Sequence, residues 1–302
     1  MTPFANPWLE RRVVAYAHQG GAWEGPSSTL FAIRRALAAG ATAIELDVHA
    51  TADGELVVCH DPTVDRTTDG HGRIAELTLE EVRALDNAYW FVPGADVTPG
   101  LDPAAYPYRG MAADDRELRI ATLREVLEAL PGVVLNLDIK QTAPAVVPYE
   151  AELARLLEEH GRRDDVIVAS FADAATERFA ALAPGIGVSA GSRATAAFWQ
   201  AVRRGAEPPV PPVVAFQVPE RLGDTVVVDR RFVEAAHRRG IAVHVWTVDD
   251  EESMGRLVDL GVDGIITDLP TTLARVLDER GAAWGGLRSA RRARPDNRGR
   301  PD

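Results

Sequence analysis

The sequence predicts an α/β fold, a TIM (β/α)8 barrel with a small subdomain inserted after the second strand. Three observations favour it. Eight short apolar, β-branched runs recur along the chain, and most are followed by segments with helical spacing of apolar residues. Glycine stands where several of these helices should end. The first run leads into His18-Gln19-Gly20-Gly21 rather than a phosphate-binding glycine-rich turn, which argues against an open doubly wound sheet.

The eight predicted strands are, in chain order, Val13–Ala17, Ala43–Val48, Val133–Ile139, Val166–Ser170, Gly185–Ser189, Val213–Val218, Ala242–Trp246 and Gly264–Thr267. Helices are predicted where apolar residues recur three and four positions apart, as in Thr29–Ala39, Leu123–Leu130, Tyr149–His160, Arg231–Arg239 and Glu251–Leu260. Eight alternating units of this kind indicate a closed parallel barrel.

Two regions depart from the alternation. We assign the barrel to residues 1–284, with an insertion over about 62–119. Within it, Asp86–Arg119 is a long irregular segment rich in proline and aromatic residues, which predicts an ordered lid or small subdomain over the barrel mouth. Residues 285–302 are rich in arginine, glycine and proline and are expected to form a disordered basic tail.

Composition excludes several classes of protein. The net charge of -12 argues against a nucleic-acid partner, because phosphates would be repelled. A single cysteine, Cys59, rules out a disulfide framework. No run approaches the roughly 20 apolar residues of a membrane span. The N-terminus lacks a secretory signal pattern, so we expect a cytoplasmic protein. The sequence leaves the oligomeric state open.

The segment Ile44–Asp61 carries the strongest sign of chemistry. Glu45 and Asp47 alternate with apolar residues, so both carboxylates should lie on the inner face of the second strand. Adjacent buried carboxylates are costly unless cations or a metal ion balance them. The chain then turns and delivers His60 beside them. This pattern predicts a metal site next to a histidine.

Other strand ends complete the set, because catalytic groups of β/α barrels lie at the C-terminal ends of the strands. The first strand ends at His18, and the third ends in Asp138 and Lys140. Lys140 is the only lysine among 33 basic residues, which suggests that its ammonium group is needed there. An alternative is that Asp138 merely pairs with Lys140.

Three carboxylates without a neighbouring cysteine favour a hard cation, Mg²⁺ or Ca²⁺, as the cofactor. A divalent ion beside two histidines suggests chemistry on a phosphate ester, with one histidine as base and the other as acid. Gln217 and Trp246 stand near the ends of later strands and are predicted to contact substrate, although Trp246 could equally pack in the core.

These residues resemble a known family, the glycerophosphodiester phosphodiesterases of the phospholipase-C-like barrel superfamily. The resemblance runs from about Val14 to Leu277. The motifs that carry it are Ala17-His18-x-Gly20, Glu45-x-Asp47-Val48, Thr51-x-Asp53-Gly54, Val57-Val58-x-His60-Asp61, Arg66-Thr67-Thr68, Thr122-Leu123-x-Glu125-Val126-Leu127, Asn136-x-Asp138-x-Lys140, Trp246-Thr247-Val248 and Gly261-Val262-Asp263-Gly264-Ile265-Ile266-Thr267-Asp268.

The resemblance implies a TIM barrel that binds a small phosphodiester and hydrolyses it to glycerol 3-phosphate and an alcohol. It implies a divalent metal held by Glu45, Asp47 and Asp138. It also implies acid and base roles for His18 and His60, and a contact between Lys140 and the phosphate. A substrate hydroxyl could attack first to give a cyclic phosphate, and the sequence leaves that open.

Three positions depart from the usual family pattern. Gln19 stands where the family normally has an arginine after the first histidine. The change removes a bidentate contact with the phosphate, but we still predict that Gln19 binds substrate. Ser27 stands where the family has glutamate, and Glu24 is the nearest replacement in sequence. Asp138 is one methylene shorter than the glutamate more common there.

Two other functions compete with hydrolysis of soluble glycerophosphodiesters. One is a lysophospholipase-D-type activity on lipids with one acyl chain, for which the aromatic insertion would form an apolar access route. The other is a non-catalytic barrel that binds a phosphorylated polyol. Buried charges that would go unused without a metal argue against the latter.

Overall fold

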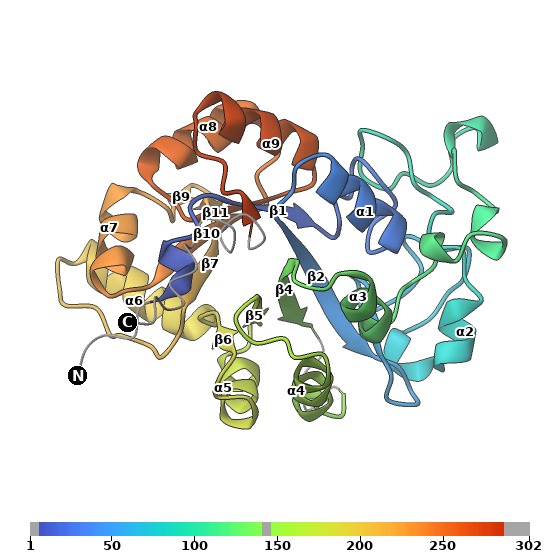
Figure 1. The fold of residues 1–302 in the computed structure, drawn as a ribbon, viewed down its shortest axis with the longest axis horizontal. Coiled ribbons are helices and arrows are strands. Elements are labelled where there is room, and N and C mark those ends of the chain that lie inside the picture. Colours follow the sequence, from blue (N-terminus) through green and yellow to red (C-terminus); the bar gives the residue numbers. More distant parts are fainter. Residues whose placement is uncertain (1–5, 141–145, 287–302) are drawn as a thin grey trace, which may run out of the picture.

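The computed structural model describes residues 6–140 and 146–286, so most of the predicted basic tail, residues 287–302, lies outside it. Eight parallel strands form the barrel, and helices encircle them (Figure 1). The strands are β1 (Val14–His18), β2 (Ala43–Ala50), β4 (Val134–Ile139), β5 (Val166–Ala169), β6 (Gly187–Val188), β7 (Ala215–Pro219), β10 (Ala242–Trp246) and β11 (Gly264–Thr267).

The sheet closes on itself in the order β6-β5-β4-β2-β1-β11-β10-β7. Between β6 and β7 a parallel bridge pairs Ser189 with Ala215, and Val214 N donates to Val188 O at 2.9 Å. These contacts close the ring, as the alternation of apolar runs predicts. All eight strands lie where the sequence placed them, so the TIM barrel is confirmed.

The described helices are α1 (Leu30–Ala38), α2 (Leu79–Arg83), α3 (Leu123–Ala129), α4 (Glu150–Glu159), α5 (Asp173–Leu182), α6 (Ser192–Arg203), α7 (Arg230–Arg238), α8 (Glu251–Leu260) and α9 (Pro270–Glu279). Local chemistry explains their ends. Thr29 caps α1 by accepting a bond from Ala32 N, and Thr122 with Glu125 forms a capping box on α3. Gly261 ends α8 at a φ of 93°, a left-handed conformation that favours glycine.

Short 3-10 turns and strands complete the described chain. They are η1 (Pro7–Leu9), η2 (Ile74–Glu76), η3 (Pro103–Ala105), η4 (Met111–Ala113), η5 (Arg116–Leu118), β3 (Leu56–Val58), β8 (Arg221–Leu222) and β9 (Thr225–Val226). β3 pairs antiparallel with β2, and β8 pairs with β9 as a separate hairpin. None of the helices in the described ranges combines the length and apolar character needed to cross a bilayer.

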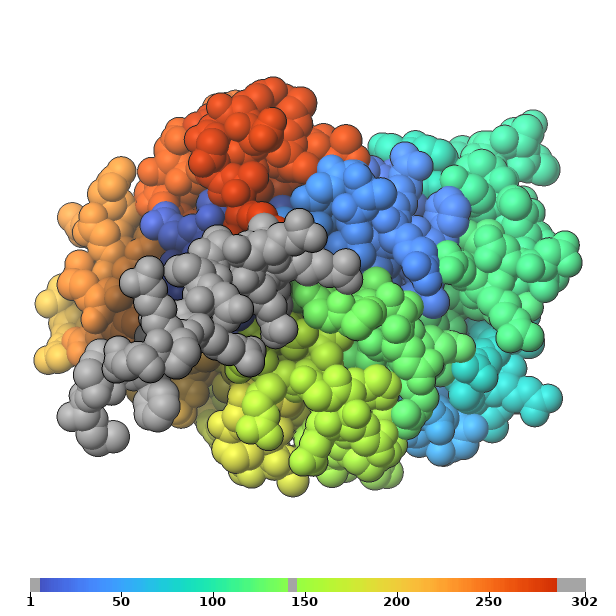
Figure 2. All heavy atoms as spheres, viewed as in Figure 1, coloured from blue at the N-terminus to red at the C-terminus, as the bar shows by residue number. Residues whose placement is uncertain are grey.

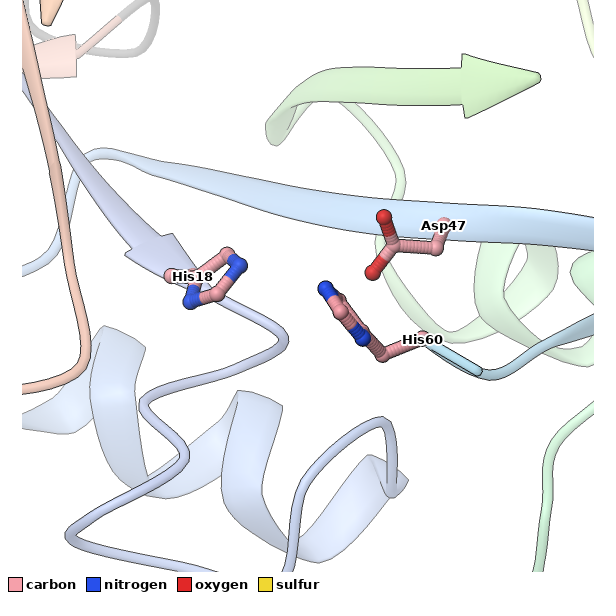
Figure 3. A group of neighbouring side chains, drawn as sticks. All are labelled: His18, Asp47 and His60. Atoms are coloured by element: carbon pink, nitrogen blue, oxygen red, sulfur yellow. The ribbon is translucent and has the colours of Figure 1, made fainter. Parts of the chain in front are cut away.

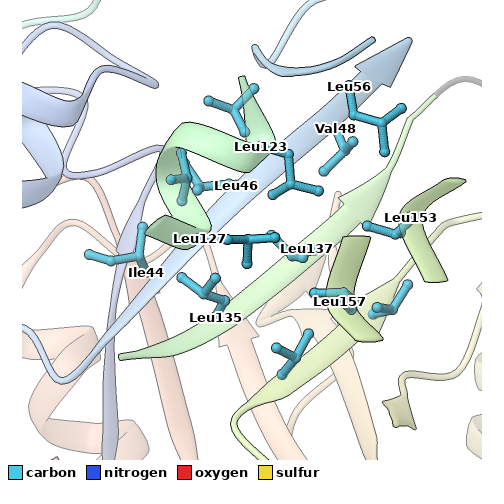
Figure 4. Close-up of a cluster of buried hydrophobic side chains, with 14 of the residues drawn as sticks. Ile44, Leu46, Val48, Leu56, Leu123, Leu127, Leu135, Leu137, Leu153 and Leu157 are labelled. Atoms are coloured by element: carbon cyan, nitrogen blue, oxygen red, sulfur yellow. The ribbon is translucent and has the colours of Figure 1, made fainter. Parts of the chain in front are cut away.

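The main core lies between the strands and the outer helices. Leu123 and Leu127 of α3 and Leu153 and Leu157 of α4 pack against the outward faces of β2 and β4 (Figure 4). These leucines are almost fully buried, and burying such a side chain stabilises the fold by about 1.5–3 kcal/mol. The packing fixes β2 and β4, and therefore the inward side chains that alternate with their apolar residues.

The insertion is an ordered lobe at one side of the barrel, coloured cyan to green in Figures 1 and 2. It packs on α1, where Phe31 contacts Tyr108 and Arg34 pairs with Glu117 at 3.0 Å. Residues 86–119 contribute no side chain to the cavity that His18, Asp47 and His60 line. The prediction of a subdomain agrees with this lobe, whereas a lid over the mouth was wrong, because the lobe's aromatic residues pack on α1 and one another.

Candidate active site

Strand register brings the predicted polar residues together at one end of the barrel. His18 of β1 lies opposite Glu45 of β2, and Asp47 lies opposite Asp138 of β4. Neighbouring positions in a parallel sheet that share a face have side chains in contact range. The apolar alternation therefore directs all these groups into the same interior space.

His18 is held by carboxylates on both sides of its ring. Its Nδ1 lies 2.7 Å from Asp268 Oδ1, and its Nε2 lies 3.8 Å from Glu45 Oε2. Burial opposes a positive charge here, but the Asp268 hydrogen bond and the Glu45 charge outweigh it and raise the pKa of His18 to about 9. Asp268 also fixes the orientation of the imidazole.

His60 faces His18 across the site (Figure 3). The two rings meet edge to face with centroids 5.8 Å apart. His60 Nδ1 lies 2.6 Å from Asp61 Oδ1, and Arg66 Nε donates to Asp61 Oδ2 at 2.6 Å. Although burial opposes ionisation, these two partners hold the pKa of Asp61 well below its usual range. Each imidazole therefore has its own carboxylate on Nδ1.

Lys140 sits between two of the carboxylates. Its Nζ lies 2.9 Å from Asp47 Oδ1 and 3.2 Å from Asp138 Oδ2. Burial opposes its charge, but the two carboxylates raise the pKa of Lys140 above its ordinary value. The ammonium group therefore keeps its charge inside the site.

The negative charge of the site exceeds what Lys140 can balance. Burial first, and then the charge of Asp47, raise the pKa of Glu45 to about 8. Burial also raises the pKa of Asp138 to about 6, against the attraction of Lys140. Shifts in this direction indicate carboxylates that would ionise readily only with a further cation beside them.

Unpartnered atoms support the same conclusion. Asp47 Oδ2 and Asp138 Oδ1 are buried and have no hydrogen-bond partner, which is costly for carboxylate oxygens. Oxygen atoms of this kind suit a hard divalent ion. Within the described ranges, the group whose ligand atoms lie within 4.8 Å of one another is His18, Asp47 and His60. Asp47 belongs both to this group and to the predicted metal ligands, Glu45, Asp47 and Asp138. The ammonium group of Lys140 lies between the carboxylates of Asp47 and Asp138.

These groups line one end of a cavity of about 640 Å³. Gln217 and Trp246 line it too, and Trp246 meets the ring of Phe171 edge to face with centroids 5.6 Å apart. Both residues therefore line the same cavity as the histidines and carboxylates, and their contact with substrate stays a prediction. Trp246 is half-buried, and it both lines the cavity and packs against the core cluster that contains Tyr16 and Ile266.

Comparison with known proteins decides the family. The profile of the glycerophosphoryl diester phosphodiesterase family matches residues 18–272. The chain belongs to this family. It is 31% identical over 273 residues to the glycerophosphodiester phosphodiesterase of Caldanaerobacter subterraneus, covering 89% of this chain and 100% of that protein. It is 28% identical to the Bacillus subtilis glycerophosphodiester phosphodiesterase, covering 88% and 86% of the two chains.

The crystal structure of the glycerophosphoryl diester phosphodiesterase domain of a Mycobacterium tuberculosis protein has the same fold. Its TM-score is 0.71 at 22% identity, and the match covers 89% of this chain and 99% of that domain. The family match and the 31% identical relative place this chain in the enzyme class of the family, the phosphoric diester hydrolases.

Gln19 does not line the cavity of this family member. It is buried beside the Nε2 edge of His18 at a φ of 52°, and Gln19 N donates to Glu45 Oε2 at 3.3 Å. Its Nε2 lies 3.2 Å from His18 Nε2, while its Oε1 is buried without a partner. Exchanging the amide oxygen and nitrogen would place Oε1 as an acceptor for His18. This geometry suits a residue that positions His18 more than one that binds phosphate.

Ser27 and Glu24, its nearest replacement in sequence, also lie away from the cavity, whereas Asp138 lines it. Ser27 is buried, and its carbonyl accepts a bond from Asn87 Nδ2 at 2.9 Å. Glu24 accepts bonds from the backbone and side chain of Thr271 at the start of α9. Glu24 therefore holds the start of α9 and does not line the cavity.

Sequence reasoning missed the two aspartates that hold the histidines. Asp61 directly follows His60, and Asp268 ends β11, which the closed barrel places beside β1. Both appear in the family motifs, but their roles depend on neighbours that only the closed sheet reveals. His244, which does not line the cavity, is fully buried.

Proposed function

We propose that this chain hydrolyses glycerophosphodiesters to glycerol 3-phosphate and an alcohol, with His18 and His60 exchanging the protons and a divalent cation held by Glu45, Asp47 and Asp138. The observation that carries the proposal is the pair of facing imidazoles. Each has a carboxylate on Nδ1, so each directs Nε2 toward the space beside Asp47. Two imidazoles on either side of a phosphodiester fit a reaction that needs both a base and an acid.

The residues present fit a divalent cation. Two buried carboxylate oxygens without partners, on Asp47 and Asp138, and the raised pKa of Glu45 all favour added positive charge. Their oxygen atoms suit Mg²⁺ or Ca²⁺ better than a metal that prefers sulfur. When bound, such an ion would neutralise charge on the phosphoryl oxygens.

The remaining groups have roles that follow from position. One imidazole takes the proton of the attacking oxygen, and the other gives a proton to the departing alcohol. Lys140 is charged, lines the cavity and lies beside Asp47, so it attracts the anionic phosphate into the site. Asp61 and Asp268 hold the imidazoles so that Nε2 of each faces substrate.

Release of glycerol 3-phosphate from glycerophosphocholine tests this function. We expect His18→Ala and His60→Ala each to lower kcat by about 10²–10⁴-fold, the usual contribution of a positioned acid or base. His71→Ala is the matched control, because His71 is exposed and lies outside the cavity. Thermal unfolding should be similar for all variants. Wild-type turnover in either active-site variant would overturn the assignment.

A further inference from the structure

The two facing imidazoles are carried by segments of different kinds. His18 is the last residue of β1, and residues 19–29, the first loop, follow it. His60 lies two residues beyond the end of β3 and belongs to no strand. It is part of residues 59–73, the second loop. The separation of the two rings therefore depends on contacts that hold the second loop against the first.

One side chain hydrogen-bonds to both loops. Asn87 Nδ2 donates to Ser27 O of the first loop at 2.9 Å. Asn87 Oδ1 accepts a bond from Thr67 Oγ1 of the second loop at 2.6 Å. The carbonyl of Ser27 can only accept, so it fixes which end of the amide carries the nitrogen. All three residues are buried, so losing either bond would leave a buried polar atom unpaired, which is costly.

The bond to the first loop leads to His18. Ser28 follows Ser27, and its backbone N–H donates to Gln19 O at 2.7 Å. Ser28 and Gln19 both have left-handed backbones, with φ of 59° and 52°, which residues other than glycine rarely adopt. Such conformations persist only where surrounding contacts hold them. Asn87 supplies one of these contacts, and Gln19 adjoins His18.

The bond to the second loop leads to His60. Thr67 follows Arg66, whose Nε donates to Asp61 Oδ2 at 2.6 Å. Asp61 Oδ1 in turn lies 2.6 Å from His60 Nδ1. A shift of Thr67 would therefore move the ion pair that orients the imidazole of His60. Asn87 thus stands between two chains of contacts, one to each ring.

Other contacts of residues 86–119 act in the same way. Gly94 N donates to Trp23 O of the first loop at 2.7 Å, and Asp86 N donates to Asp69 Oδ1 of the second loop at 2.9 Å. This segment contributes no side chain to the cavity. It therefore supports both loops from outside the site rather than contacting a ligand.

We propose that Asn87 is a positioning residue, which sets the separation of the His18 and His60 imidazoles by joining the two loops that carry them. The inference rests on the proposed function, because the separation affects turnover only if both imidazoles transfer protons. Proton transfer requires each ring within hydrogen-bond reach of the reacting atoms, and a misplacement of about 1 Å can lower a rate by about 100-fold. Asn87 lies outside the cavity, so substrate binding should be unaffected.

Two substitutions break this joint to different extents. Asn87→Leu keeps a similar volume and removes both bonds, whereas Thr67→Val keeps its shape and removes only the bond to Asn87. With glycerophosphocholine as substrate, we expect kcat to fall about 10- to 100-fold in the first and about three- to tenfold in the second, with KM within about twofold. The double variant should be no slower than Asn87→Leu, because Thr67 acts through Asn87.

Tyr106→Phe is the matched control within the same segment. It also removes two hydrogen bonds, because Tyr106 Oη donates to Thr98 O and accepts from Leu101 N, but neither bond reaches a loop. It should leave kcat and KM unchanged. Hydrogen exchange should be faster in residues 19–28 and 61–72 of Asn87→Leu than in the wild type, and unchanged there in Tyr106→Phe.

Wild-type kcat in Asn87→Leu, an equal loss in Tyr106→Phe, or a change confined to KM would overturn the inference. Multiplying effects in the double variant would show that Thr67 acts independently and would also contradict it. If Asn87→Leu does not fold, Thr67→Val decides the test, and wild-type kcat in that variant is the contradicting result. Failure of the wild-type protein to hydrolyse glycerophosphocholine would overturn the proposed function instead.

Discussion

The two sides of the catalytic cavity differ in almost every property. The side formed by β1, β2 and β4 carries imidazoles, carboxylates and one ammonium group, and Asp268 holds His18 while Asp47 holds Lys140. The opposite side, from β5 through α6 to β10, carries no charged lining residue among those described. The difference separates chemistry from recognition, so changes on the charged side should alter kcat and changes on the apolar side should alter KM.

The largest effect is expected from removing a carboxylate of the proposed metal site. Loss of a residue that only hydrogen-bonds to a metal ligand costs roughly 10- to 100-fold in activity. Asp47→Asn should lower kcat by more than this. It should also abolish the rise in unfolding temperature that Mg²⁺ or Ca²⁺ gives the wild-type protein. Kinetics and thermal unfolding, each with and without added metal, check both results. Asp65→Asn, on the exposed surface, should behave as wild type.

A smaller loss should follow from removing the carboxylates behind the histidines. Asp268→Asn and Asp61→Asn should each lower kcat by about 10- to 100-fold with little change in KM, because they orient the imidazoles without contacting substrate. The pH profile of kcat is the decisive readout. For Asp268→Asn the limb set by His18 should move to lower pH, since that carboxylate raises the pKa of His18. An unchanged profile would mean that Asp268 is merely structural.

The apolar side should give a different signature. Trp246→Ala should raise KM for glycerophosphocholine about three- to tenfold and leave kcat within about twofold, the scale expected for one aromatic contact. Trp246→Phe should restore most of the affinity. A loss confined to kcat would contradict the separation of the two sides.

The smallest effect concerns stability rather than catalysis. Burial lowers the pKa of His244 to about 4, so the native protein keeps it neutral. The unfolded chain protonates it near its ordinary value, about 6.5. As the pH falls, the unfolded state binds this proton before the native state does. The free energy of unfolding therefore decreases as the pH falls from about 6.5 to about 4. From about pH 7 to about pH 5 this loss is about 2 kcal/mol.

Urea unfolding at the two pH values measures this loss. In His244→Gln the difference between the two free energies of unfolding should shrink by that amount, while His71→Gln should retain the wild-type difference because His71 is exposed. An undiminished difference in His244→Gln would show that other groups cause the acid sensitivity.

The lining residues of the charged side could be predicted from the sequence, whereas on the apolar side only Gln217 and Trp246 were. Glu45, Asp47 and Asp138 interrupt apolar runs with period two, so strand geometry alone directs them inward. The β8–β9 hairpin has two-residue strands, which are too short for a periodic signal. Its place beside α6 depends on the Trp199 and Arg203 contacts across the chain.

The insertion shows the same limit. Its aromatic content correctly indicates order, but aromatic residues pack equally well on a helix or over a mouth. Only tertiary contacts such as Phe31 with Tyr108 decide between these positions. Composition predicts that such a segment folds, whereas its docking site depends on surfaces formed elsewhere in the chain.

The most direct test of the charged side is a titration of Mg²⁺ or Ca²⁺ into chelator-treated protein, with glycerol 3-phosphate release followed in the same samples. We predict no measurable turnover without metal, a rise that parallels metal binding in the wild type, and neither binding nor recovery in Asp47→Asn. Full turnover by the metal-free wild-type protein, or equal metal binding by the variant, would contradict this account of the site.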